Sequence, residues 1–256
     1  MFARPDGTVV KVWRRADHGW RADRESAALT TLRAQGHTAP RVLGPATVDG
    51  RPGLILERVD GGDLLSALGR RPLAVFGAGR VMGEVHAAMH DCVAPDTLPS
   101  LHDQLRPRLE EAADLPDDLR EAALGLLDGL PPGDRLCHGD LHLGNVLGSW
   151  TAPMVIDWAD AARGDPVGDV ANTVVLHRVG EPPPGSPQVV RSLASLGRRV
   201  LRDRYLATYR GRRAVDPGLL ARWEFVRAAA RVWAPVPNEY PALLRLLRAP
   251  HQVFHA

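Results

Sequence analysis

The sequence predicts an α+β fold with two lobes, a small N-terminal lobe built on a sheet and a larger, mostly helical C-terminal lobe. Up to about residue 58, short β-branched segments bounded by turn residues alternate with one helical pattern. After Gly61-Gly62, longer segments with helical periodicity follow. We therefore expect one lobe over residues 1–58 and a second over residues 59–256.

Short strands form the predicted sheet of the N-terminal lobe. Residues 8–14, TVVKVWR, combine β-branched and aromatic side chains, which favours a strand that carries Lys11. A hairpin is predicted next, with strands near 46–48 and 53–58 around Asp49-Gly50, because Asp-Gly is a preferred hairpin turn. Lys11 is the only lysine among 32 basic residues. It is therefore a candidate for a role that needs a compact point charge.

One helix is predicted between these strands. Asp23 is a candidate N-cap for a helix from about Arg24 to Gln35, which Gly36 would end. Glu25 shares a helical face with apolar residues three, four and seven positions later. We therefore expect the Glu25 carboxylate on the buried side of this helix.

The C-terminal lobe begins with helices and contains a β-rich insert. Helical periodicity predicts helices over 63–68, 73–90, 101–113 and 119–127. A loop over 138–145 follows, and short strands are expected near 145–147 and 154–156. Beyond Asp169 the pattern is helical again. The loop therefore lies between strands, next to the helices of this lobe.

The segment around this loop combines two carboxylates and an amide. Asp140 is followed five residues later by Asn145 and twelve residues after that by Asp157. Phosphoryl transfer from a nucleotide needs a carboxylate that orients the attacking hydroxyl and accepts its proton, and hard oxygen ligands that hold magnesium. These three side chains supply both requirements. A strand lysine held by a buried carboxylate can also contact nucleotide phosphates, which fits Lys11 and Glu25.

Two motifs resemble those of a known superfamily. HGDLHLGNVL, from His138, and VIDWADAARGDPVGDVA, from Val155, are similar to motifs of the aminoglycoside phosphotransferase and choline kinase superfamily, which has a protein-kinase-like fold. The resemblance spans about residues 8–235 and is closest over 138–169. It implies a bilobal kinase that uses ATP, or alternatively GTP, and Mg²⁺ to phosphorylate a hydroxyl of a small molecule, either antibiotic-like or a metabolite.

The resemblance also implies roles for the C-terminal residues. Asp140 would be the catalytic base in the catalytic loop 138–145. Asn145 and Asp157 would be the magnesium ligands, with Asp157 in the metal-binding segment 156–158. The acceptor site would belong to the same lobe.

The N-terminal lobe would bind the nucleotide. By the resemblance, Lys11 holds the α- and β-phosphates, and Glu25 is its ion-pair partner. Glu57 and Val59 lie in the connector to the second lobe, where a backbone carbonyl of Glu57 and a backbone amide of Val59 would receive adenine.

The N-terminus departs from the family pattern. The family lobe usually starts with two strands joined by a loop over the phosphates, ahead of the strand with the lysine. Here ten residues precede Lys11, so one strand and the covering loop are expected to be missing or drastically shortened, unless the chain starts upstream of Met1. Fewer backbone donors predict weaker nucleotide binding. A nucleotide-binding pseudokinase or sensor is therefore the alternative to an active kinase.

Several other features have simpler explanations. His86 and His90 stand one helical turn apart, but the glutamate of a zinc-type HExxH motif is absent, so packed or surface histidines are favoured. Gly77 and Gly79 resemble part of a dinucleotide motif without its preceding strand, which favours helix-packing glycines. After the metal-binding segment, Asp160 and Asp165 are expected to be exposed loop carboxylates.

Charge is distributed unevenly along the chain. Residues 176–256 contain 14 arginines and five acidic residues, which leaves 18 basic and 25 acidic residues in 1–175. Arginines at helical spacing are most simply a solvated face, so no nucleic-acid partner is expected. An arginine-rich segment near the acceptor site favours an acceptor less cationic than an aminoglycoside. The acidic residues of this segment that could instead make the pocket acidic are Asp203, Asp216, Glu224 and Glu239.

Composition also suggests where the protein acts. Cys92 and Cys137 show neither disulfide-framework nor zinc spacing, which favours a reducing compartment. The N-terminus lacks a secretory pattern, and no segment reaches the roughly 18 apolar residues of a membrane helix. We expect a cytoplasmic monomer or homodimer with no membrane partner.

Overall fold

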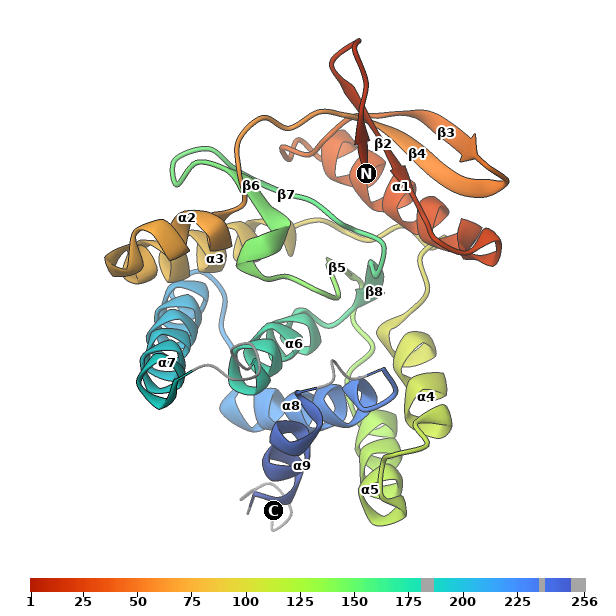
Figure 1. Cartoon of the computed structure of the whole chain (residues 1–256). Coiled ribbons are helices and arrows are strands. Elements are labelled where there is room, and N and C mark those ends of the chain that lie inside the picture. The colour runs from red at the N-terminus through yellow and green to blue at the C-terminus, as the bar shows by residue number, and fades with distance from the viewer. Residues whose placement is uncertain (181–186, 235–237, 250–256) are drawn as a thin grey trace.

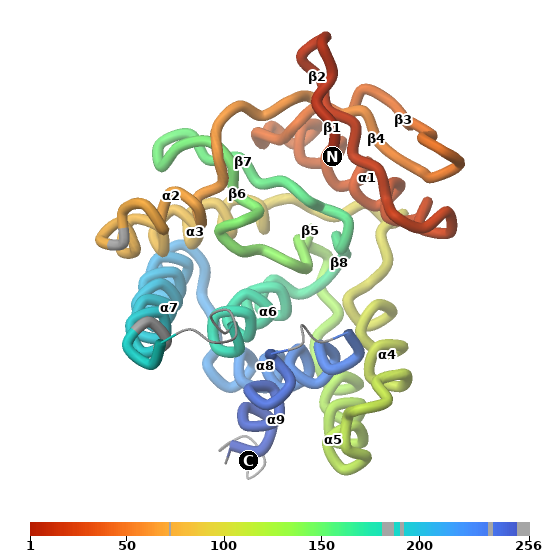
Figure 2. The backbone as a smooth tube through the Cα atoms, in the orientation of Figure 1, coloured from red at the N-terminus to blue at the C-terminus, as the bar shows by residue number. Residues whose placement is uncertain are grey.

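The computed structural model describes residues 1–180, 187–234 and 238–249. A small sheet with one helix against it occupies one end of the molecule, and the other helices occupy the opposite end (Figure 1). The predicted α+β fold with a small N-terminal sheet and a larger helical part is confirmed. The chain passes from the sheet to the helical part through residues 58–63, as the backbone trace in Figure 2 shows.

The N-terminal sheet has four antiparallel strands. In spatial order they are β1 (Phe2–Ala3), β2 (Thr8–Val12), β4 (Arg51–Glu57) and β3 (Val42–Val48). Lys11 lies on β2, as predicted. Asp49 and Gly50 join β3 to β4 with φ of 50° and 72°, and positive φ at both residues is the pattern of a type I′ hairpin turn. One strand of only two residues precedes β2 in this sheet.

Helix α1 (Gly19–Ala34) packs against β3 and β4. The expected N-cap at Asp23 is wrong, because the 3₁₀ turn Ala16–His18 leads directly into the helix and Asp23 lies inside it. The expected inward face is confirmed: Glu25 is only 2 % exposed. Its burial beside the sheet brings a carboxylate under β2.

Helices dominate the rest of the chain. They are α2 (Leu64–Arg70), α3 (Val75–Met89), α4 (Leu101–Glu111), α5 (Asp117–Asp128), α6 (Pro166–Val179), α7 (Gln188–Arg210), α8 (Pro217–Arg231) and α9 (Tyr240–Arg248), with 3₁₀ turns at Pro72–Ala74 and Leu143–Asn145. Helix α6 packs against both α7 and α8 and is buried along most of its length. No helix within the described residues is long and apolar enough to span a bilayer.

Two small two-stranded sheets flank the loop over 138–145 in the C-terminal lobe. Strand β5 (Arg135–Cys137) pairs with β8 (Ala162–Gly164), and β6 (Val146–Gly148) pairs with β7 (Pro153–Val155). The second pair was predicted, whereas β8 was not, because its sequence Ala-Arg-Gly carries no strand preference. Residues 138–145 leave β5 and enter β6, so both ends of this loop are fixed by a sheet.

Helices α3 and α7 approach each other closely at glycines of α3. A Cβ atom on Gly79 would lie 2.7 Å from the carbonyl oxygen of Leu201, and one on Gly83 would lie 2.7 Å from that of Tyr205. By contrast, a Cβ atom on Gly77 would have no atom within 4 Å. The helix-packing interpretation therefore holds for Gly79 and not for Gly77.

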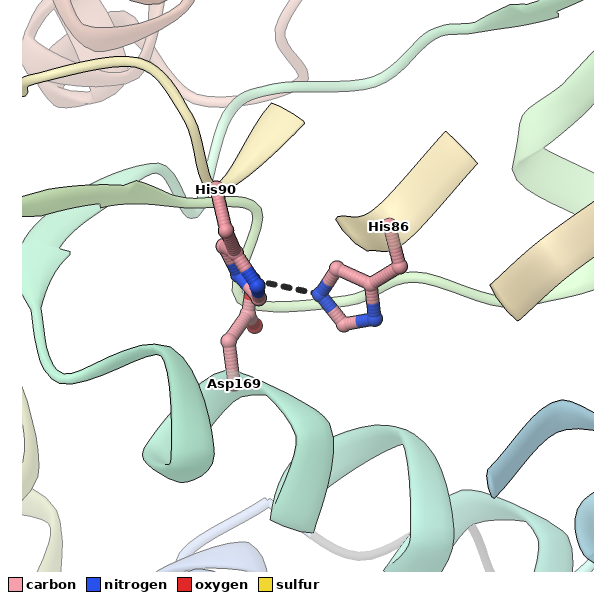
Figure 3. Close-up of side chains that lie close together, drawn as sticks. All are labelled: His86, His90 and Asp169. Atoms are coloured by element: carbon pink, nitrogen blue, oxygen red, sulfur yellow. Dashed lines mark hydrogen bonds and ion pairs between the residues drawn. The ribbon is translucent and has the colours of Figure 1, made fainter. Parts of the chain in front are cut away.

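Beside this contact, a fully buried polar network joins α3, α6 and α7. His86 and His90 point from α3 to Asp169 on α6 (Figure 3), with Nε2–Oδ2 distances of 3.1 and 3.4 Å. A carboxylate only accepts, so each Nε2 carries the proton, and each Nδ1 lies 2.7 Å from a hydroxyl, of Tyr205 and Tyr209 respectively. The three side chains have metal-ligand types and lie close together, but these hydrogen bonds already occupy them. Both histidines are therefore packed structural residues, one of the expected interpretations.

Substitutions at two positions of α3 should have opposite effects on stability. We expect Gly79→Ala to lower the free energy of unfolding by about 1–3 kcal/mol, because the methyl group meets the backbone of α7. Gly77→Ala is the matched control, and it should raise the free energy by up to about 1 kcal/mol through helix propensity. Urea denaturation of both variants measures this, and equal effects would contradict the close helix contact.

The buried network should make stability depend on pH. Burial, with His86 nearby, lowers the pKa of His90 to about 4, whereas an unfolded histidine titrates near about 6.5. Between these values the unfolded chain binds a proton that the folded chain does not, so stability falls as the pH decreases from 7 to 5. The contribution of His90 to this loss is on the order of 2 kcal/mol.

Urea denaturation at pH 7 and pH 5 tests this expectation. The difference between the two pH values should be smaller in His90→Gln than in the wild type, even if the variant is less stable at both. An unchanged difference would show that His90 is not the group that titrates.

Candidate functional site

The loop over 138–145 takes its shape from a buried carboxylate beneath it. Asp169 accepts hydrogen bonds from the backbone amides of His138, at 2.5 Å, and Gly139, at 2.9 Å. Burial opposes the charge of Asp169, but its hydrogen bonds from His86 and His90 hold its pKa well below the usual value. The carboxylate therefore stays ionised and orients the start of the loop.

His138 links this loop to the segment that contains Asp157. Its Nε2 donates to the carbonyl oxygen of Ile156 at 3.0 Å, and its Nδ1 accepts from the amide of Asp140 at 3.1 Å. This arrangement requires a neutral ring, and burial lowers the pKa of His138 accordingly. The side chain thus fixes the backbone next to two predicted site residues.

Asp140 projects from the loop toward a cavity. Its side chain is 41 % exposed, and the cavity beside it has a volume of about 180 Å³. Packing of the protein around the carboxylate raises its pKa to about 6, while the charge of Arg231 opposes this rise. At pH 7 the carboxylate is mainly ionised and has a pKa suited to accepting a proton.

Asn145 is the last residue of the loop and is buried, and Asp157 borders the space between the lobes. The Nδ2 of Asn145 donates to the carbonyl oxygen of Asp140 at 3.0 Å, so its Oδ1 points away from that bond. Asp157 has a φ of 64°, which is unusual for a residue other than glycine. Such strained backbone is often found at functional sites.

Lys11 joins the two lobes through its ammonium group. Its Nζ forms an ion pair with Glu25 on α1 and a second one, at 2.7 Å, with Oδ1 of Asp157. Burial raises the pKa of Glu25, and the charge of Lys11 opposes this rise. The side chain of Lys11 is 14 % exposed and that of Glu25 is 2 % exposed, so this pair has little access to water. The lysine is thus held in one position, beside the carboxylate of the other lobe.

A second, smaller cavity of about 60 Å³ lies between the lobes next to these carboxylates. Both connector residues, Glu57 and Val59, border it, together with Glu25 and Asp157. The Glu57 carboxylate accepts from the amide of Arg41 and therefore points away from this space. Its apolar walls come from Val9, Leu29, Leu56, Leu147 and Ile156. Such a slot between apolar side chains suits a flat ring.

The structure brings together most of the residues that the sequence singles out. Lys11, Glu25 and Asp157 are in direct contact, Asp140 and Asn145 are joined by a hydrogen bond, and the two connector residues border the neighbouring cavity. These residues come from both lobes. Asp140 borders the first cavity, whereas Glu25, Glu57, Val59 and Asp157 border the second.

The expectation for the two carboxylates after the metal-binding segment is wrong. Asp165 is buried and caps α6 by accepting from the amide of Val167. Asp160 is 25 % exposed and pairs with Arg108 at 2.9 Å and Arg21 at 3.4 Å. Burial alone would raise the pKa of Asp160, but these guanidinium groups lower it. Both partners come from distant parts of the chain, so no local pattern could have identified them.

Other side chains at the Asp140 cavity were also missed by sequence reasoning. They come from α1, α4 and α8: Arg21, Arg108, Arg227 and Arg231. The arginine-rich C-terminal segment was the available signal, but it did not distinguish arginines at the site from those on a solvated face.

Comparison with known proteins agrees with this geometry. A family model described as the phosphotransferase enzyme family matches residues 3–194. No curated protein sequence matches the chain. Among solved structures, an aminoglycoside-3'-phosphotransferase of type VIII has a TM-score of 0.59 and 21 % identity, over 86 % of this chain and 83 % of that chain.

Two ligand-bound structures are also similar. The amicoumacin kinase hAmiN, in complex with AMP-PNP, Ca²⁺ and Ami, has a TM-score of 0.60 and 15 % identity, over 96 % of this chain and 82 % of that chain. The phosphotransferase APH(3'')-Id from Streptomyces rimosus, in complex with ADP and streptomycin, has a TM-score of 0.54 and 19 % identity, over 90 % and 89 % of the two chains. At these identities the likeness shows the fold, whereas the family match covers most of the chain. This chain therefore belongs to the phosphotransferase enzyme family and is a kinase with the protein-kinase-like fold.

Proposed function

We propose that this kinase transfers the γ-phosphate of ATP to a hydroxyl group of a small molecule, in a Mg²⁺-dependent reaction with Asp140 as the base. The observation that carries the proposal is the position of Lys11, whose ammonium is held by Glu25 of one lobe and Asp157 of the other. A lysine fixed in this way is placed to bind nucleotide phosphates. Asp140, on the adjacent loop, faces the cavity from which an acceptor hydroxyl would approach.

The donor atoms at Asn145 and Asp157 fit a magnesium ion. Magnesium prefers carboxylate and amide oxygens, and the Asn145 amide is oriented with its nitrogen on the carbonyl oxygen of Asp140, which leaves Oδ1 available as a ligand. Asp157 is 48 % exposed, and Lys11 contacts one of its two oxygens. When bound, the ion would neutralise charge on the phosphates.

The space next to Lys11 supports a purine nucleotide as the donor. Its apolar walls are suited to a base, and Glu57 and Val59, which border it, are the residues whose backbone would hydrogen-bond that base. The AMP-PNP and ADP of the similar structures support an adenine nucleotide here. GTP is the alternative donor.

Within this arrangement each side chain has a separate task. Asp140 orients the acceptor hydroxyl and accepts its proton, which its pKa of about 6 permits at neutral pH. Lys11 binds the phosphates, and Glu25 keeps the lysine ammonium in place. His138 and Asp169 hold the loop that carries Asp140.

A nucleotide-binding pseudokinase is the second candidate. It is supported by the apolar slot between the lobes, which suits a nucleotide base whether or not phosphate transfer follows. Against it stands the joint presence of Asp140, Asn145 and the ion pairs of Lys11 with Glu25 and Asp157. The two candidates differ in one measurable property, the turnover of ATP with an acceptor.

Substitution of Asp140 should separate these functions. With an acceptor that supports turnover, we expect Asp140→Asn to reduce kcat by about 10²–10⁴-fold, because the group that takes the hydroxyl proton is lost. Coupled detection of ADP measures the rate. Asp118→Asn, an exposed aspartate in the first turn of α5, is the matched control and should keep the wild-type rate.

The outcome discriminates between the two candidate functions. Equal rates in Asp140→Asn and the wild type would exclude Asp140 as the base. Saturable ATP binding without ADP formation, across neutral, anionic and cationic hydroxyl compounds, would favour the pseudokinase.

A further inference from the structure

The cavity next to Asp140 has a strongly basic lining. Its walls are formed by residues of both lobes, and its volume is about 180 Å³. Four of its lining residues are arginines and two are aspartates, Asp140 and Asp160. The four arginines are Arg21, Arg108, Arg227 and Arg231. This excess of positive charge lies where the acceptor must bind for its hydroxyl to reach Asp140.

Arg227 is the most unusual of the four arginines. It is 2 % exposed and lies on α8, where its Nε donates to the carbonyl oxygen of Gly168 at 2.8 Å. Within the described part of the chain its guanidinium forms no ion pair, and its Nη2 has no hydrogen-bond partner. Burial lowers the pKa of Arg227, and the nearby charge of Asp169 opposes this. A buried guanidinium without a paired carboxylate is costly unless a ligand supplies the missing anion.

The other three arginines have too few carboxylate partners to balance the charge of Arg227 as well. Arg21 and Arg108 share the single carboxylate of Asp160, and the buried Nε of Arg21 also lacks a partner among the described residues. Arg231 is paired with Glu239 through two hydrogen bonds. Two guanidinium groups on one carboxylate and a third with none leave a net positive site, even with Asp140 ionised.

The carboxylates that could have made this pocket acidic are engaged elsewhere. Asp203 pairs with Arg202, Asp216 caps α8, and Glu224 pairs with Arg178. None of these three is among the described residues that line the cavity, and Glu239 neutralises Arg231. Of the two arginines that the C-terminal segment contributes to the cavity, Arg231 is therefore balanced by a carboxylate and Arg227 is not.

We propose that the acceptor of this kinase carries an anionic group, a carboxylate or a phosphate monoester, and that Arg227 binds that group while Asp140 receives the hydroxyl. This inference rests on the proposed function and specifies its substrate class. Trp233, which is 45 % exposed, forms one wall of the cavity. A polycationic aminoglycoside would meet like charge in this cavity. The expected acceptor is thus a small hydroxy acid or a phosphorylated polyol.

A series of acceptors on one carbon skeleton tests the charge preference directly. Glucose, glucosamine, glucuronate and glucose 6-phosphate differ mainly in charge, and each would be assayed with ATP and Mg²⁺ by coupled detection of ADP. We expect kcat/KM to be at least about tenfold higher for an anionic member than for glucose, the range of one charge-assisted interaction. The sugar acid and the phosphate ester distinguish the two sources of anionic charge.

A binding measurement keeps the inference testable if none of these sugars is turned over. Malate and inorganic phosphate would be titrated into the wild-type protein, and saturable thermal stabilisation by either is expected. Arg227→Gln should weaken this binding at least about tenfold. Arg222→Gln removes the same charge from the same helix, lies outside the cavity lining, and should bind like the wild type.

The nucleotide is also anionic, so the role of Arg227 must be assigned to one substrate. We expect Arg227→Gln to raise the KM of the anionic acceptor far more than the KM of ATP, and Arg227→Lys to restore part of the loss because it retains the charge. An equal or larger effect on ATP would overturn the inference, since Arg227 would then bind the donor.

Failure of the inference can be distinguished from failure of the proposed function. Asp140-dependent turnover of glucose or glucosamine in preference to both anionic sugars would overturn the anionic acceptor while leaving the kinase activity intact. Arg227-dependent anion binding without any turnover would support the charge selection and count against the transfer. Absence of both anion turnover and saturable anion binding would overturn the inference.

Discussion

The buried carboxylate of Asp169 holds the loop that carries Asp140 in place. It is fully buried on α6, yet its hydrogen bonds reach helix α3 through His86 and His90 and the loop over 138–145 through two backbone amides. A buried charge is tolerated only when it is fully hydrogen-bonded. The need to satisfy this one charge therefore ties the loop with Asp140 to the helical core and fixes the start of that loop.

The two lobes meet at a second group of charges with a different purpose. Lys11, Glu25 and Asp157 form a chain of ion pairs across the lobes, but Asp157 is half exposed and sits in strained backbone. Unlike the Asp169 network, this group is open on one side and can exchange partners. Glu25 contacts the same ammonium as Asp157, so the lysine keeps one carboxylate partner when Asp157 takes another cation. The fully hydrogen-bonded network of Asp169 thus fixes the loop, whereas the ion pair of Lys11 with the half-exposed Asp157 can be replaced.

Sequence reasoning succeeded where function depends on short spacings. Asp140, Asn145 and Asp157 lie within one segment, so the sequence alone could group them. The inward position of Glu25 follows from helical periodicity, and the fold class could also be predicted. It failed where a residue's environment depends on distant segments. The partners of Asp160 come from α1 and α4, and β8 is a strand only because β5 pairs with it. The start of α1 was missed because a 3₁₀ turn replaced the usual cap.

The arginines of α8 also show that the environment of a residue cannot be predicted from its sequence position alone. In the sequence, Arg222, Arg227 and Arg231 are equivalent members of one basic helix, and a solvated face explains them equally well. In the structure Arg231 has a carboxylate partner, whereas Arg227 is buried without one and lines the cavity at Asp140. Each of the three contributes the same charge to the sequence. Of the three, only Arg227 carries the free-energy cost of a buried charge without a carboxylate partner. Specificity for an acceptor can therefore depend on one residue that composition cannot distinguish from its neighbours.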